Sequence, residues 1–290
     1  MGTASDRQSS VPVPVAESSL PEARLEVREV TKRYVSARTG EEVYALKPMT
    51  LEVGHGEFLS IVGPSGCGKS TLLKMIAGLE SPSSGEIAMD GEPTSGPSPA
   101  RVLVFQQYAL FPWKTVRENV EFGLRAAGVK KVERERRVAR FISMVGLGGF
   151  ENKYPHELSG GMQQRCALAR ALVVDPVMLL MDEPLAAVDA QTRVLLQEEL
   201  LQIWGEERTV EKRQSVVYVT HNIDEAVYLS DRVIVMSSRP GSIKAVVDVA
   251  LPRPRTFHTR TTPECLALIE QIWVLIRDEI TLRDSEAPIV

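Results

Sequence analysis

A glycine-rich segment constrains this chain of 290 residues more than any other feature. Residues 63–71 read Gly-Pro-Ser-Gly-Cys-Gly-Lys-Ser-Thr and match the pattern G-x-x-x-x-G-K-[ST] at every position. The apolar residues 58–62 before it predict a buried strand, and residues 71–77 after it predict a helix that stops at Gly78. In that setting backbone amides turn inward around an anion, and the helix start adds the positive end of its dipole. We therefore predict a nucleotide-phosphate site; the alternative is a glycine-rich turn without a ligand.

The side chains of this segment, here called the phosphate loop, have separate expected roles. Lys69 is expected to reach the β- and γ-phosphates of a nucleotide, and the Ser70 hydroxyl to bind Mg²⁺. The rest of the loop is expected to surround the phosphates: Gly63, Pro64, Ser65, Gly66, Cys67, Gly68 and Thr71. Cys67 also has a plainer interpretation as a packing residue, although a thiol in this loop could be alkylated.

Two acidic residues follow a second apolar run, at 177–181. A strand that ends in this way places carboxylates at the edge of a sheet where α/β proteins bind ligands. Asp182 is expected to serve Mg²⁺. Glu183, which we expect to point the other way on an extended backbone, is suited to polarise an attacking water. Two acids that merely cap a strand are the alternative interpretation.

The order of apolar patterns predicts an α/β fold. Further buried strands are expected at 102–105, 215–220 and 232–236, with helical patterns between them, which favours a largely parallel sheet. Residues 1–23, rich in Ser and Pro, predict a flexible extension, and 24–255 predict one nucleotide-binding domain. Residues 108–160 predict a helical insertion, in which the charged run 130–137 is interpreted as a solvated helix face rather than a binding face. Residues 256–290 predict a helical tail, whose helix at 263–280 is expected to place Leu266, Ile269, Trp273 and Ile276 on one side.

Composition narrows the classes of function. Lys and Arg number 34 against 38 Asp and Glu, a net charge of −4, which argues against a broad nucleic-acid-binding face. The apolar runs are too short to span a membrane. Three cysteines, Cys67, Cys166 and Cys265, are spaced for neither a zinc site nor a disulfide framework. The first residues lack the basic and apolar stretches of a secretory signal, so we expect a cytoplasmic location.

Residues 158–165, Leu-Ser-Gly-Gly-Met-Gln-Gln-Arg, decide among phosphate-loop families. With them, the sequence from about residue 25 to 251 resembles the ATP-binding-cassette (ABC) ATPases. The resemblance implies a P-loop NTPase (RecA-like) fold with an N-terminal antiparallel β subdomain and an inserted helical subdomain. Four single residues match elements of the family: Gln106 the Q-loop glutamine (with Gln107 as the alternative), Asp189 the D-loop, His221 the switch histidine and Tyr34 the adenine-stacking aromatic.

The resemblance also implies a mechanism. Ser159, Gly160 and Gly161 begin a second anion-binding helix, which in this family completes the site of the facing subunit, so a homodimer holding two ATP molecules is implied. Glu183 would act as general base or orient the water, His221 would hold the γ-phosphate, Gln106 would sense Mg²⁺ and water, and Asp189 would link the two sites. The chain departs from the family at two positions, Val188 for Leu and Asn222 for Asp.

Finer features resemble the ATPases of nitrate, sulfonate and taurine importers: residues 111–120, Met162, Ser238-Arg-Pro-Gly-Ser-Ile and Leu251-Pro-Arg-Pro-Arg. This implies a peripheral protein at the cytoplasmic face of the inner membrane. Its partners would be permease subunits, one helix of which docks beside Gln106, and indirectly a solute-binding protein. No regulatory β-domain is expected. Alternatives are another ABC importer or exporter, or a soluble cassette of translation or DNA repair; the soluble classes carry two cassettes or a long coiled coil, and neither is present. Residues 205–213 are long for the family and have no assigned role.

Overall fold

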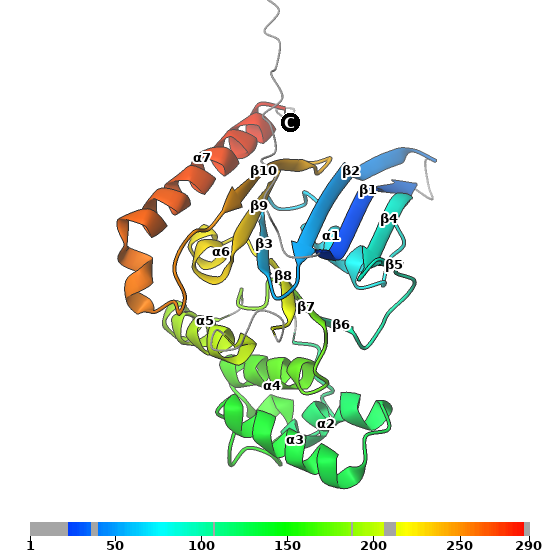
Figure 1. Cartoon of the computed structure of the whole chain (residues 1–290), viewed down its shortest axis with the longest axis vertical. Helices are drawn as coiled ribbons and strands as arrows, with labels where there is room; N and C mark the ends of the chain where they lie inside the picture. Colours follow the sequence, from blue (N-terminus) through cyan, green and yellow to red (C-terminus); the bar gives the residue numbers. More distant parts are fainter. Residues whose placement is uncertain (1–22, 36–39, 107, 187, 206–212, 287–290) are drawn as a thin grey trace, which may run out of the picture.

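Two β-sheets make up the upper part of the molecule (Figure 1). The computed structural model describes residues 23–35, 40–106, 108–186, 188–205 and 213–286. The predicted extension at 1–23, apart from Ala23, and most of the stretch at 205–213 lie outside these residues. The smaller sheet is antiparallel and runs in the order β2-β1-β4-β5; its strands are β1 (Ala23–Val35), β2 (Glu42–Gly54), β4 (Ser84–Met89) and β5 (Glu92–Pro93).

The larger sheet carries the strands expected from the apolar runs. Its order is β10-β9-β3-β8-β7-β6, and all neighbours pair in parallel except β9 and β10. The strands are β3 (Phe58–Val62), β6 (Arg101–Val104), β7 (Met178–Asp182), β8 (Ser215–Val219), β9 (Arg232–Met236) and β10 (Ile243–Asp248). Every residue of β3 and β8 is buried, as expected for central strands covered on both faces.

The core lies on both faces of this larger sheet. One apolar cluster joins it to α1 (Lys69–Ile76) and to the antiparallel sheet, through residues such as Ile61, Leu73 and Val27. The other face is covered by α4 (Gly160–Leu172), α5 (Ala190–Trp204) and α6 (Ile223–Leu229). The phosphate loop therefore sits between a buried strand and a buried helix, which fixes its position.

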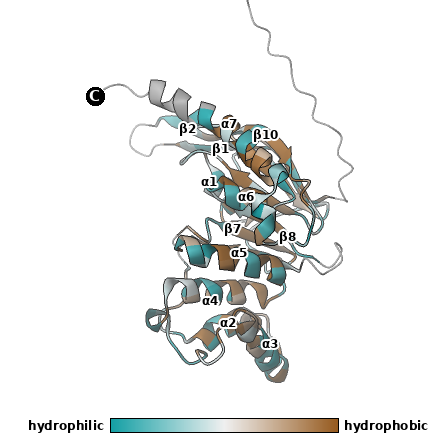
Figure 2. Ribbon diagram, turned by 90° about the vertical axis from the view of Figure 1, so that its left-hand side faces the viewer, coloured by the Kyte–Doolittle hydropathy of each residue, from teal (hydrophilic) through white to brown (hydrophobic). Residues whose placement is uncertain are grey.

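A helical lobe lies below the sheets (Figure 2). It contains α2 (Val116–Ala126), α3 (Lys131–Met144) and the short 3-10 helix η1 (Pro155–Glu157), and it packs against α4. Val138, Ile142 and Val145, which recur at helical spacing, are buried in one cluster, and Phe141 packs against it. Thr115 begins α2 with a capping box: its hydroxyl accepts from the Glu118 amide, and the Glu118 carboxylate accepts from the Thr115 amide.

The last described helix, α7 (Pro263–Glu286), follows the 3-10 helix η3 (Phe257–Thr261) and covers α6, β9 and β10. Its predicted apolar side is wrong in part, since Leu266 and Trp273 are exposed. The buried side instead presents Cys265, Ile272 and Ile276. Both stripes are apolar at helical spacing, so the sequence of the helix does not choose between them. In the described part of the chain, no helix is both long and apolar enough to cross a bilayer.

Candidate nucleotide site

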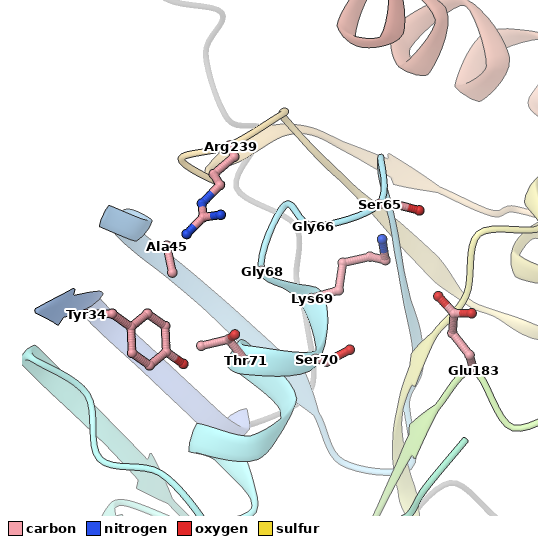
Figure 3. Close-up of a pocket in the computed structure, with 10 residues that line it drawn as sticks. All are labelled: Tyr34, Ala45, Ser65, Gly66, Gly68, Lys69, Ser70, Thr71, Glu183 and Arg239. Atoms are coloured by element: carbon pink, nitrogen blue, oxygen red, sulfur yellow. The ribbon is translucent and has the colours of Figure 1, made fainter. Parts of the chain in front are cut away.

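One pocket of about 310 Å³ opens at the phosphate loop, at the carboxyl ends of the parallel strands (Figure 3). It is lined by Tyr34, Ala45, Ser65, Gly66, Gly68, Lys69, Ser70, Thr71, Glu183 and Arg239. Gly68 caps α1 with a φ of 103°, a left-handed conformation, and a Cβ built on it would lie 2.5 Å from the Leu46 side chain. Only glycine fits there, so the second glycine of the pattern follows from the contact between the loop and β2.

Lys69 is buried and folds back over the loop. Its ammonium donates hydrogen bonds to the carbonyls of Gly63 at 2.8 Å and Pro64 at 3.0 Å, and it lies 3.9 Å from the Cys67 sulfur. A buried cation held only by neutral carbonyls is poised for a stronger anionic partner. Gly63, Pro64 and Cys67 therefore shape the loop from behind, whereas the pocket wall is formed by the other loop residues. Burial raises the pKa of the Cys67 thiol, while the Lys69 charge opposes that rise.

The structure brings Ser70 and Asp182 together. The Ser70 hydroxyl donates to Asp182 Oδ1 at 2.9 Å, which joins the start of α1 to the end of β7. Burial raises the pKa of Asp182, the Ser70 hydrogen bond lowers it, and the net direction is upward. A hydroxyl and a carboxylate oxygen side by side are the hard donors that Mg²⁺ prefers, so these residues fit a Mg²⁺ ion.

Glu183 faces the same pocket, but not on an extended backbone. Its φ is 45°, so the chain turns directly after β7, and the Glu183 amide donates to the Val219 carbonyl at 2.9 Å. The expectation of an extended conformation here is wrong, because a left-handed residue ends the strand. His221 Nδ1 lies 2.9 Å from Glu183 Oε2. An ionised carboxylate only accepts, so in that state the imidazole donates.

The other end of the pocket is formed by Tyr34, Ala45 and Arg239 (Figure 3). The Tyr34 ring is partly exposed, and its hydroxyl donates to Glu80 at 2.8 Å. Sequence analysis proposed Tyr34 but missed Ala45 and Arg239. The signal for Arg239 was present in the segment Ser238-Arg-Pro-Gly-Ser-Ile, which was used only for the family resemblance.

The remaining predicted residues do not line this pocket. Gln106 is exposed in the loop after β6, and Gln107 lies outside the described residues. Ser159 caps α4, where its hydroxyl accepts from the Met162 amide at 3.3 Å, with Gly160 and Gly161 in the first turn. Asp189 caps α5, and its carboxylate accepts from the Thr192 amide at 3.0 Å. Hydrogen bonds from the backbone amide and the side chain of Thr192 lower the pKa of Asp189.

Comparisons with known proteins identify the family. A family profile described as ABC transporter matches residues 46–186. An uncharacterized ABC transporter ATP-binding protein of Methanocaldococcus jannaschii is 51% identical over 257 residues, which is 89% of this chain and 92% of that protein. The chain belongs to the ABC transporter ATP-binding proteins. This ABC ATPase carries the family motifs and the α/β fold that the resemblance implied.

Further relatives of this ABC ATPase have more specific names. The nitrate import ATP-binding protein NrtD of Synechocystis is 43% identical, covering 91% of this chain and 98% of that one. The aliphatic sulfonates import ATP-binding protein SsuB of Bacillus cereus is 46% identical, covering 82% and 91%. Among solved structures, a dimeric ATP-binding cassette in a post-hydrolysis state with ADP and Pi has a TM-score of 0.67 and 35% identity, covering 78% of this chain and 98% of that one.

The two departures from the family pattern have a structural account. Asn222 caps α6, and its side-chain oxygen accepts from the Glu225 amide at 3.0 Å, so an amide performs the capping that a carboxylate would perform. Val188 is buried in a small cluster with Leu185 and Leu196. Val188 thus packs the loop before Asp189, and the departure concerns packing rather than chemistry.

Proposed function

We propose that this ABC ATPase drives import of a small solute, an anion such as nitrate, a sulfonate or taurine. ATP hydrolysis is supported by one observation: Lys69, the Ser70–Asp182 pair and the Glu183–His221 pair lie together at one pocket. The import part is supported by the two importer ATPases among its relatives. The protein would work as a peripheral subunit at the cytoplasmic face of the membrane, with permease subunits and, outside, a solute-binding protein.

The proposed reaction is attack of water on the γ-phosphate of ATP. Lys69 exchanges its loop carbonyls for β- and γ-phosphate oxygens, and the loop amides hold the remaining charge. Bound Mg²⁺ would be held by Ser70 and Asp182 and would neutralise phosphate charge. Gln106, exposed in the loop after β6, is proposed to sense this Mg²⁺ and the attacking water. Glu183 orients the water and accepts its proton, and His221, donating to the Glu183 carboxylate, fixes the orientation of that group. Tyr34 stacks on the adenine.

The proposed active form is a homodimer. The start of α4 is exposed at Ser159 and Gly160 and half-buried at Gly161, and Asp189 at the start of α5 is exposed. Neither helix start lines the pocket of its own chain. In a head-to-tail dimer these segments would close the pocket of the partner. The dimeric cassette with ADP and Pi supports this arrangement, because it matches over most of the present chain.

The permease contact is proposed at the aromatic surface beside Gln106. Phe105, Trp113 and Phe122 are exposed there, with Trp113 70% exposed, and the ring of Phe111 packs at 4.6 Å from Phe122. Arg170 of α4 donates to the carbonyls of Tyr108 and Ala109 at 3.0 and 2.8 Å. The loop after Gln106 is thereby tied to the helix that Ser159 caps, so a permease helix here would move with that helix.

A substitution of Glu183 tests the ATPase and dimer assignments together. Glu183→Gln keeps the shape but cannot accept the water proton, so turnover is expected to fall by at least about a hundredfold. ATP should still bind and should hold the dimer, which size-exclusion chromatography with ATP detects. Lys69→Ala is the matched loss-of-binding variant and should stay monomeric. A Glu183→Gln protein that hydrolyses ATP at the normal rate, or is only monomeric with ATP, would contradict the assignment.

The solute and the permease contact need a transport assay. Deleting the gene should abolish uptake of one candidate anion, and growth on nitrate, sulfonates and taurine distinguishes the candidates. Trp113→Ala should lower uptake severalfold while leaving the ATPase activity of the isolated protein unchanged, because Trp113 lies outside the pocket. Secretion of a solute in place of uptake would instead support an exporter.

A further inference from the structure

The turn between β9 and β10, residues 237–242, has no role in the mechanism above. It carries Arg239, which lines the nucleotide pocket. Figure 3 shows the Arg239 guanidinium above Ala45 and on the same side of the phosphate loop as Tyr34, whereas Glu183 and the Lys69 ammonium lie on the other side. Among the described residues, no hydrogen bond or ion pair to this guanidinium is seen. A cation therefore faces the Tyr34 end of the pocket without a fixed acceptor.

The turn is pressed against the phosphate loop and β2. The Gly241 amide donates to the Ala45 carbonyl at 3.0 Å, and the Lys47 amide donates to the Gly241 carbonyl at 2.9 Å. A Cβ built on Gly241 would lie 1.9 Å from the Cys67 carbonyl oxygen, so no side chain fits between the turn and the loop. The backbone that carries Arg239 is thus positioned directly by the loop that is expected to bind the phosphates.

A buried carboxylate of α7 holds the residue before Arg239. Glu279, 7% exposed, accepts from the Ser238 amide at 2.8 Å and from the Ser238 hydroxyl at 3.0 Å. Its other oxygen pairs with Lys244 of β10 at 2.9 Å. A carboxylate with three donors is well satisfied, and it fixes the backbone at Ser238 from outside the ATPase core.

The positive charge of Arg239 affects the pKa of the Tyr34 hydroxyl. Burial is the main cause of the raised pKa of the Tyr34 hydroxyl, and its hydrogen bond to Glu80 adds to it. The positive charge of Arg239 acts in the opposite direction. Both side chains also line the same pocket, so one bound ligand can contact both. A guanidinium stacks on an aromatic ring and donates to ribose or phosphate oxygens, both of which suit a nucleotide at this end.

We propose that Arg239 binds the nucleoside part of ATP, opposite Tyr34, and that Glu279 is a positioning residue for Arg239. The proposal rests on the nucleotide site proposed above. It makes α7 part of the nucleotide-binding machinery, because the path from Glu279 through Ser238 to Arg239 ends at the ligand. It also separates two functions of the pocket: Lys69 binds the phosphates, and Arg239 binds the nucleoside to which they are attached.

Two ligands distinguish these functions: Mg-ATP and Mg-tripolyphosphate, which lacks the nucleoside. Binding is measured by calorimetry on the full chain. Arg239→Ala should weaken ATP binding by about tenfold, the size of one charge-assisted or stacking contact, and leave tripolyphosphate binding within about twofold. Arg239→Lys should be intermediate, since a lysine keeps the charge but not the planar group. Arg140→Ala, an exposed position on α3, is the control and should change neither.

The outcomes distinguish an error in the role of Arg239 from an error in the phosphate site. Arg239→Ala with normal ATP affinity, or with equal loss of both ligands, would overturn the assignment to the nucleoside. Lys69→Ala should lose both ligands; if it binds both normally, the phosphate site itself is wrong, whatever Arg239 does.

A double-mutant cycle tests Glu279. Glu279→Gln should weaken ATP binding about threefold to fivefold in the native background and have no effect in the Arg239→Ala background. Glu270→Gln, an exposed carboxylate on the same helix, is the control and should have no effect in either. Equal losses in both backgrounds would overturn the positioning role. If Glu279→Gln lowers the melting temperature, Ser238→Ala, which removes only one of the bonds, must show the same dependence on Arg239 for the proposal to stand.

Discussion

Arg255 offers the sharpest test of how the fold holds the segment after His221. It is 5% exposed, and Nη1 donates to the carbonyls of Val227, Tyr228 and Ser230 at 3.1, 2.9 and 2.7 Å. These carbonyls belong to the end of α6, where a helix leaves its last four acceptors without internal partners. A buried arginine at this place satisfies them and also matches the negative end of the helix dipole.

The change Arg255→Met keeps most of the apolar stem and removes the donors. The three bonds to the end of α6 are lost, together with two longer ones of 3.5 Å from Nη2 to the carbonyls of Val249 and Leu251. Buried carbonyls left unsatisfied cost about 1–3 kcal/mol each. The removal of the buried charge offsets part of this cost, because its own desolvation penalty disappears. The expected loss of unfolding free energy is therefore about 3–5 kcal/mol. Since α6 begins at Ile223, two residues after His221, ATP turnover should fall as well.

Urea denaturation followed by circular dichroism measures this loss as a lower midpoint at unchanged slope. Arg140→Met, at an exposed position on α3, is the control and should stay within about 0.5 kcal/mol of the native chain. A loss below about 1 kcal/mol for Arg255→Met would refute the reasoning, because it would mean that the carbonyls of α6 find other donors.

Two further predictions concern titratable groups. Burial raises the pKa of Asp182, and Mg²⁺ needs the ionised carboxylate. Affinity for Mg-nucleotide should therefore fall on acidification at a higher pH than for an ordinary Asp. Calorimetry at a series of pH values from neutral downward, while the chain stays folded, should show this dependence flattened in Asp182→Asn. All three cysteine thiols, Cys67, Cys166 and Cys265, are buried, and burial raises their pKa, that of Cys166 to about 12. Maleimide should therefore label the native protein slowly, whereas it should label all three cysteines of the urea-unfolded protein. Fast labelling of the native protein would contradict the packing described here.

The parallel strands could be predicted because their signal is local. The bounds of β3 and β9 match the apolar runs in the sequence, since a strand covered on both faces is apolar throughout. The sequence analysis did not single out β4, β5 or β10. In β4 only Ile87 and Ala88 are buried, and its pairing depends on β1, more than fifty residues earlier, as in the register Val27 to Ile87. Such strands are defined by their partners rather than by their own composition.

The candidate site likewise contains residues that the sequence predicts and features that it does not. Lys69, Ser70, Asp182 and Glu183 could be predicted because each lies beside a short motif with a chemical reason. The left-handed turn at Glu183 could not, since nothing in an acidic residue predicts a positive φ. Arg239 was missed because its segment marks the family but not a place in the pocket: Arg239 reaches the pocket only through the close approach of the Gly241 turn to the phosphate loop.

The covering of the sheet by α7 has a consequence for how the protein is made. Val227, Val249 and Leu251 are buried with Ile272 and Ile276 of that helix. On the ribosome, α7 emerges after every element that it covers, so this apolar face stays open while residues 252–276 are added. At about 5–20 residues per second the delay is on the order of one to five seconds. During that time the growing chain presents a surface that chaperones bind, and that a second nascent chain could also reach.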